Sequence, residues 1–265
     1  MTTKKVGAII QARINSTRLP RKVLLPLAGK TSLWWTVQRA RQAKLVDSVI
    51  IATTNSSDNN RINYHAINQT FHDFDVPEAH RTELIDFEIY RYGGDENDVI
   101  NRVLCAAKEY DIDIIVDITG DCNVIDFYEI DVMVDAILKD ESLDYVSNVM
   151  ERTFCDGLDI QVYKTESLQR LIRMHNPQTH VGWNFIKHKS DFNTLNFKAP
   201  AKYNHPEICI VLDCELDYIL MKQIFNKFGH TTSFKSTDVV DYLLGNPKLL
   251  SINNSVKRKD PEKEG

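Results

Sequence analysis

The segment VGAIIQARINSTRLPRK (residues 6–22) decides the fold, because it joins an apolar run directly to a polar, basic loop. Residues 6–10 have the length and composition of a short buried strand. Residues 33–40 then place apolar side chains on one helical face, and we expect Ser32 to cap that helix. A strand, a loop and a helix in this order form the first unit of a parallel α/β sheet.

The same alternation continues along the first half of the chain. Residues 48–52, 88–91 and 114–118 are predicted strands, and each of them runs into a polar loop. Residues 98–110 and 126–138 are predicted amphipathic helices. The predicted class is therefore α/β, with a doubly wound, mostly parallel sheet whose ligands collect at the carboxyl ends of the strands.

The second half is less regular. Strands are predicted at residues 145–148, 158–162 and 209–212, and helices at residues 165–174, 214–228 and 237–244. We expect residues 1–250 to form a single domain, with residues 175–206 as a lid or a dimer-contact insertion. Residues 251–265 are expected to be a charged flexible tail.

Composition excludes several classes of protein. A net charge of −5 and a pI near 5.9 argue against a nucleic-acid binder, and no apolar run approaches the length of a membrane span. Five cysteines without CxxC spacing suggest neither a disulfide framework nor a zinc site. We expect a cytoplasmic enzyme that binds neither nucleic acid nor membrane.

The first loop carries the strongest chemical signal. It concentrates the cations Arg13, Arg18, Arg21 and Lys22 beside a sheet edge, and such a loop suits a triphosphate and its leaving pyrophosphate. The loop lacks the GxxxxGK[ST] pattern of a P-loop, so a solvated basic loop is the alternative.

Several blocks give the chain a family resemblance. They are residues 9–13 (IIQAR), 16–20 (STRLP), 22–24 (KVL), 94–102 (GDENDVINR), 119–122 (TGDC) and 156–159 (DGLD). In order and spacing they resemble the cytidylyltransferases that activate sialate and octulosonate sugar acids, most closely the spore coat polysaccharide biosynthesis branch. The resemblance implies a nucleotide-diphospho-sugar transferase fold of the GT-A-like type, and a homodimer.

The resemblance also assigns roles to residues. It implies CTP as a substrate, magnesium as the cofactor, and Arg13, Arg18 and Lys22 as the catalytic cations. The remaining implied sites are for nucleotide, at Gln11, Ala12, Arg13, Ser16, Asn97 and Asp98; for metal, at Asp121 and Asp213; and for a sugar-acid acceptor, at Asp156, Asp159 and His180.

The residues themselves support the metal pair. Asp121 and Asp213 each follow a predicted strand, and carboxylates that converge beside a triphosphate suit Mg²⁺. The alternative for Asp213 is capping of the next helix, and for Asn97 it is capping of the helix at 98–110. For the 156–159 segment it is formation of a turn. We expect contacts to the base from Ala12 and from residues 53–58.

The chain departs from the family pattern at Asn15, Arg21, Asn123, Thr179 and residues 214–217. Two other functions therefore stay open beside CMP transfer from CTP to a sugar acid. One is a glycosyltransferase that uses a nucleotide sugar, although the DxD triplet at residues 111–113 precedes its strand. The other is a non-catalytic CTP-binding subunit. Trp183 and Phe185 are candidates for either a dimer contact or the core.

Overall fold

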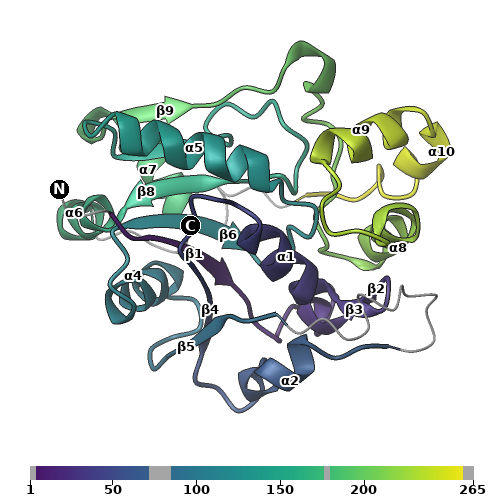
Figure 1. Ribbon diagram of the computed structural model, residues 1–265, viewed down its shortest axis with the longest axis horizontal. Helices are drawn as coiled ribbons and strands as arrows, with labels where there is room; N and C mark the ends of the chain where they lie inside the picture. The colour runs from purple at the N-terminus through teal and green to yellow at the C-terminus, as the bar shows by residue number, and fades with distance from the viewer. Residues whose placement is uncertain (1–3, 72–84, 176–179, 259–265) are drawn as a thin grey trace.

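The computed structural model describes residues 4–71, 85–175 and 180–258 (Figure 1). Its central sheet has seven strands in the order β5-β4-β1-β6-β8-β7-β9. Their bounds are β1 (Val6–Gln11), β4 (Ser48–Thr54), β5 (Glu88–Tyr92), β6 (Ile114–Thr119), β7 (Tyr145–Ser147), β8 (Gln161–Lys164) and β9 (Thr194–Asn196). All neighbours are parallel except β8, which runs antiparallel to β6 and β7. The predicted mostly parallel α/β sheet is confirmed.

Helices cover both faces of this sheet. One face carries α1 (Ser32–Arg41) and α5 (Phe127–Lys139), and the other carries α4 (Val99–Glu109), α6 (Thr165–His175) and α7 (Val181–Lys187). Successive side chains of β1 pack against opposite faces of the sheet. Ala8 belongs to one apolar cluster and Ile9 to the other, as the two-residue period of a strand requires.

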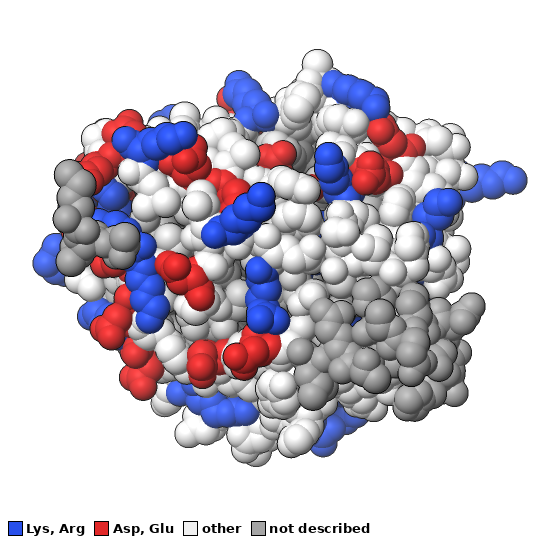
Figure 2. All heavy atoms as spheres, in the orientation of Figure 1, with Lys and Arg blue, Asp and Glu red and all other residues white. Residues whose placement is uncertain are grey.

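The described chain has further elements besides this sheet and the helices that cover it. They are β2 (Pro26–Leu27), β3 (Lys30–Thr31), α2 (Tyr64–Ile67), α8 (Glu215–Phe228), α9 (Ser236–Leu244), α10 (Pro247–Leu250) and the 3₁₀ helices η1 (Lys22–Leu24), η2 (Asn59–Arg61), η3 (Lys189–Asp191) and η4 (Ala201–Tyr203). Among the described helices, none has both the length and the apolar character that a membrane span needs. On the face shown in Figure 2, basic and acidic side chains are interspersed and form no basic stripe.

The cap predicted for α1 and the cap considered as an alternative for α4 each lie one residue away from the observed one. Thr31, and not Ser32, caps α1, since its hydroxyl accepts a hydrogen bond from the Trp34 amide. Asp98, and not Asn97, caps α4 by accepting from the amide of Asn101. In both cases the adjacent residue carries the capping oxygen, so the helix type was predicted correctly and its first residue was not.

The predicted strand at residues 209–212 is wrong. In this segment the structure has only an isolated bridge, between Cys209 and Asp156. Gly157, with φ of +105°, turns the chain so closely that a Cβ there would meet the backbone of Ile210 at 2.7 Å. Because residues 156 and 157 fold against this segment, β8 begins only at Gln161, three residues later than predicted.

Part of the expected insertion at residues 175–206 belongs to the main sheet and core. Thr194–Asn196 is the edge strand β9, and Phe185 is fully buried against Tyr145 and Tyr163. Phe185 is therefore a core residue. A lid or dimer role for the rest of this region stays a prediction.

The expected flexible tail is wrong for residues 251–258. Asn253 is buried and donates to the carbonyl of Cys209 and to a carboxylate oxygen of Asp217. Arg258 forms a bidentate ion pair with the same aspartate. Composition could not reveal this docking, because the partner of the segment lies on α8. Residues 259–265 lie outside the described residues.

We expect Asn253→Ala to lower the free energy of unfolding by about 1–3 kcal/mol, because it leaves the carbonyl of Cys209 without its side-chain donor and removes one of the donors to Asp217. Urea denaturation measures the change. Asn254→Ala is the matched control, since Asn254 is the exposed neighbour and should change stability by less than about 0.5 kcal/mol. Equal effects of the two substitutions would contradict the docked segment.

Candidate active site

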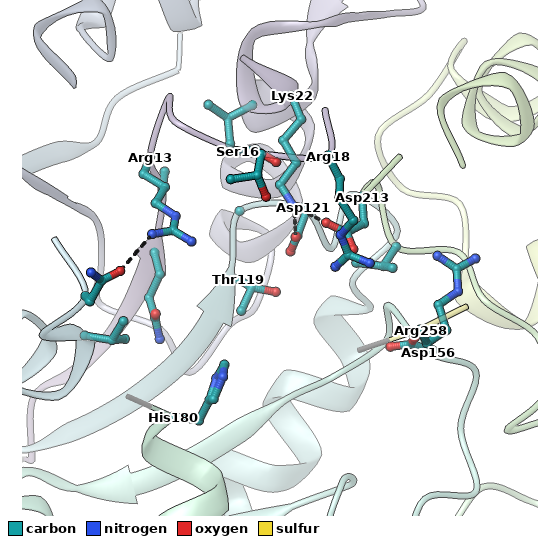
Figure 3. Close-up of a pocket in the computed structure, with 18 of the residues that line it drawn as sticks. Arg13, Ser16, Arg18, Lys22, Thr119, Asp121, Asp156, His180, Asp213 and Arg258 are labelled. Atoms are coloured by element: carbon teal, nitrogen blue, oxygen red, sulfur yellow. Dashed lines mark hydrogen bonds and ion pairs between the residues drawn. The ribbon is translucent and has the colours of Figure 1, made fainter. Parts of the chain in front are cut away.

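The carboxyl edge of the sheet holds a cavity of about 680 Å³. Gln11 and Thr119, at the ends of β1 and β6, contribute to its lining, together with the loops that follow β1, β5 and β6 (Figure 3). The predicted site residues that line it are Gln11, Ala12, Arg13, Ser16, Arg18, Lys22, Asn97, Asp121, Asp156, His180 and Asp213. One cavity therefore unites the predicted nucleotide, metal and acceptor residues.

An ionic cluster stands at the centre of this cavity. Lys22 Nζ lies 2.5 Å from Asp121 Oδ2 and 3.0 Å from Asp213 Oδ1, and Arg18 also pairs with Asp213. Burial alone would lower the pKa of Lys22, but the two carboxylates outweigh it and raise that pKa. Burial would raise the pKa of Asp121, but Lys22 outweighs it and lowers that pKa. Lys22 and Asp121 are therefore both charged at neutral pH.

Hydrogen bonds hold the loop after β1, which places Lys22 in the cavity. The amide of Ile14 donates to Asn59 Oδ1 at 2.8 Å, and Asn59 is fully buried. Arg21 adopts a left-handed conformation with φ of 59°, directly before the 3₁₀ turn of η1. The hydroxyl of Ser32 donates to the carbonyl of Lys22. The main chain on both sides of Lys22 is thus held before any ligand binds.

Asp121 and Asp213 fit a divalent cation. The ammonium group of Lys22 already stands where their oxygens converge, in the manner of a bound cation. Asp121 Oδ1 is buried and lacks a hydrogen-bond partner of good geometry in the described part of the chain. Mg²⁺ prefers one or two carboxylates with phosphate oxygens, so this pair can hold it once a nucleotide draws Lys22 away.

A second group of potential metal ligands lies outside the cavity lining. The ligand atoms of His175, His188 and Asp191 all lie within 4.8 Å of one another. The two imidazole rings stack, with centroids 3.6 Å apart and planes 12° apart. Lone pairs of stacked rings lie in parallel planes and do not converge on one point, so we assign no metal ion to this group.

One wall of the cavity suits a nucleotide. Arg13 Nη1 lies 3.4 Å from Asn97 Oδ1, which links the first loop to the loop before α4. Asp98 is absent from the lining of this cavity: besides capping α4, it accepts a hydrogen bond from the Tyr92 hydroxyl. The 53–58 loop, expected to contact the base, is likewise absent from this lining.

Asp156 and Arg258 lie together across the cavity from Arg13, and His180 lines the cavity apart from both (Figure 3). Burial and the neighbouring Asp159 raise the pKa of Asp156, against the opposing effect of Arg152. Asp159 does not line the cavity, because both of its oxygens accept from the guanidinium group of Arg152. Thr179, the departure beside His180, lies outside the described residues.

Arg102, Thr119 and Arg258 are polar residues of the lining that the sequence analysis did not predict as site residues. Arg102 and Thr119 stand inside motifs that carry the family resemblance, so their position was a usable signal. No sequence signal pointed to Arg258, because it stands in a charged segment that resembles a solvated tail.

Two departures from the family pattern have structural roles. Asn123 is buried and donates to the carbonyl of Ser32 and to the hydroxyl of Thr36, which ties the end of β6 to α1. Asp217 accepts hydrogen bonds from the amides of Asp213 and Cys214 and so holds the start of α8.

A cationic cleft with two convergent carboxylates, at the carboxyl edge of a doubly wound sheet, is the site of a nucleotidyltransferase. Comparison with known proteins agrees, since a family model described as cytidylyltransferase matches residues 7–219. The chain belongs to the cytidylyltransferase family, and the predicted class of enzyme is confirmed.

Three similar proteins show which members of this family the chain resembles. The spore coat polysaccharide biosynthesis protein SpsF of Bacillus subtilis is 26% identical over 244 residues, which cover 90% of this chain and 94% of that protein. A solved cytidylyltransferase from Leptospira borgpetersenii is 27% identical, with a TM-score of 0.80, and the match covers 97% of this chain and 100% of that one. The 3-deoxy-manno-octulosonate cytidylyltransferase of Bdellovibrio bacteriovorus is 28% identical over 140 residues, or 53% of this chain and 49% of that enzyme.

We expect Lys22→Met to tighten the binding of Mn²⁺ to the nucleotide-free protein by about tenfold or more, because it removes the positive charge between Asp121 and Asp213. Titration followed by electron paramagnetic resonance measures free Mn²⁺ directly. Lys44→Met removes an exposed lysine and should leave the affinity unchanged. If Lys22→Met binds Mn²⁺ no better than the wild type, these carboxylates are not the metal site.

Proposed function

We propose that this enzyme transfers CMP from CTP to a sugar acid and releases pyrophosphate. The observation that carries the proposal is the Lys22–Asp121–Asp213 cluster inside a cleft of the cytidylyltransferase family. The names of two relatives, a polysaccharide biosynthesis protein and an octulosonate cytidylyltransferase, favour an acceptor of the sugar-acid class.

The basic loop binds the triphosphate in this proposal. Arg13, Arg18 and Lys22 supply fixed positive charge where negative charge grows on the departing pyrophosphate, and such charge stabilises a phosphoryl-transfer transition state. Asp121 and Asp213 would hold Mg²⁺, which neutralises phosphate oxygens when it is bound. Arg18 and Lys22 then exchange their carboxylate partners for phosphate.

The opposite wall receives the acceptor. The carboxylate of Asp156 can accept a hydrogen bond from an acceptor hydroxyl, and the guanidinium group of Arg258 faces the same space and can pair with an acid group. The attacking hydroxyl and the α-phosphorus are thereby held on one line between two walls. Positioning and electrostatics supply most of the catalysis.

The test is pyrophosphate release from each of the four nucleoside triphosphates with Mg²⁺, against a panel of nonulosonic, octulosonic and smaller hydroxy acids. We expect release with CTP and one class of acid. Binding of CTP without release across the panel would favour a non-catalytic subunit, and failure to bind CTP would overturn the proposal.

With the acid that supports release, we expect Asp121→Asn to lower kcat by at least about a thousandfold, because it removes a metal ligand and the partner of Lys22. The same pyrophosphate assay at saturating Mg²⁺ measures it, and circular dichroism checks the fold. Asp135→Asn, an exposed aspartate on α5, is the control and should retain full activity. Wild-type turnover in Asp121→Asn would remove Asp121 from the site.

A further inference from the structure

The buried carboxylate of Asp117 lies behind the active site and has no part in the proposed transfer of CMP. Asp117 lies on β6 and is only 2% exposed, in the middle of the sheet. Burial raises its pKa to about 6, against the lowering effect of its hydrogen bonds. An ionised carboxylate in such a place opposes folding unless its oxygens are satisfied, so its presence calls for a role.

Both oxygens of Asp117 have specific partners. Oδ1 accepts from the side-chain amide of Gln11 at 2.5 Å, and Oδ2 accepts from the Tyr163 hydroxyl at 2.8 Å. Tyr163 is fully buried, and its ring packs against Tyr145 and Phe185. The core thus fixes Tyr163 and Asp117, and Gln11 is the member of the chain that reaches the cavity.

This chain sets the orientation of the Gln11 amide. An ionised carboxylate can only accept hydrogen bonds, so the NH₂ group of Gln11 must turn toward Asp117. The carbonyl oxygen, Oε1, is then the end of the amide left for a ligand, and among the described residues none is recorded as donating to it. The cavity therefore contains a hydrogen-bond acceptor, Gln11 Oε1, whose direction is set by the buried side chain of Asp117.

The place of Gln11 in the cavity suggests what this oxygen contacts. The phosphates of a nucleotide belong beside Lys22 and Asp121, and the acceptor belongs beside Asp156. Gln11 and Asn97 line the remaining side, where the nucleoside has to lie. Cytosine carries an amino donor at the ring position where uracil carries a carbonyl acceptor, so an oriented acceptor distinguishes the two bases.

We propose that Gln11 Oε1 accepts a hydrogen bond from the amino group of cytosine, and that Asp117 is the positioning residue that makes the site select CTP over UTP. This inference rests on the proposed function, because it requires a pyrimidine nucleotide in the cavity. A ribose hydroxyl as the partner of Gln11 is the competing arrangement, and it would give no discrimination between the bases.

The test compares the Kd values of CTP and UTP for the full-length protein with Mg²⁺ at pH 8, measured by isothermal titration calorimetry. In Asp117→Asn the new amide can donate to Gln11 Oε1, so the Gln11 amide can reverse and present its NH₂ group to the base. We expect the ratio of the UTP Kd to the CTP Kd to fall by at least about tenfold, or 1.4 kcal/mol. Gln11→Ala should also lose the discrimination.

Tyr163→Phe is the matched control. It removes the other hydrogen bond of Asp117 and so perturbs the same buried network, but Asp117 Oδ1 still dictates the direction of Gln11. The ratio of Kd values should stay within about twofold of the wild type. An unchanged ratio in Asp117→Asn, or an equal loss in Tyr163→Phe, would overturn the inference. Equal wild-type affinity for CTP and UTP would do so too, whereas absence of CTP binding would overturn the proposed function itself.

Discussion

The contact between Lys22 and the carboxylates of Asp121 and Asp213 is the interaction on which the site depends. It joins the loop after β1, the end of β6 and the start of α8, which are far apart in the sequence. A partly buried ion pair contributes little net stability, but removing one member leaves an uncompensated charge. The contact therefore matters less for stability than for placing three charged groups from distant segments at one point of the cavity.

Much of the fold was predictable because it follows from local patterns. The apolar run of β1 and the loop after it are adjacent in sequence, so strand, loop and helix could be placed from residues 6–40 alone. Asp121 could be placed for the same reason, because it closely follows β6. The error of one residue at Thr31 shows the limit of such patterns: neighbouring hydroxyls compete for one cap, and only the backbone geometry decides.

Contacts between distant segments could not be predicted. Arg258 lies in a segment whose composition indicates solvation, yet it pairs with the buried Asp217, which stands 41 residues earlier in the chain. The 209–212 segment has the composition of a strand, but Gly157 brings another loop against it, and it forms only one isolated bridge, to Asp156 in that loop. Propensity describes a residue and its neighbours, whereas these outcomes depend on what the fold places opposite them.

Two aspartates that lie close together in the sequence show how its partners decide the role of a carboxylate. Asp117 and Asp121 are four residues apart, yet burial raises the pKa of Asp117 while Lys22 lowers that of Asp121. Asp121 faces a cation, and its charge is available to a metal ion. Asp117 faces the neutral donors Gln11 and Tyr163, so its charge serves to orient them. Substitution by asparagine should therefore act differently at the two positions, on turnover at Asp121 and on the choice of base at Asp117.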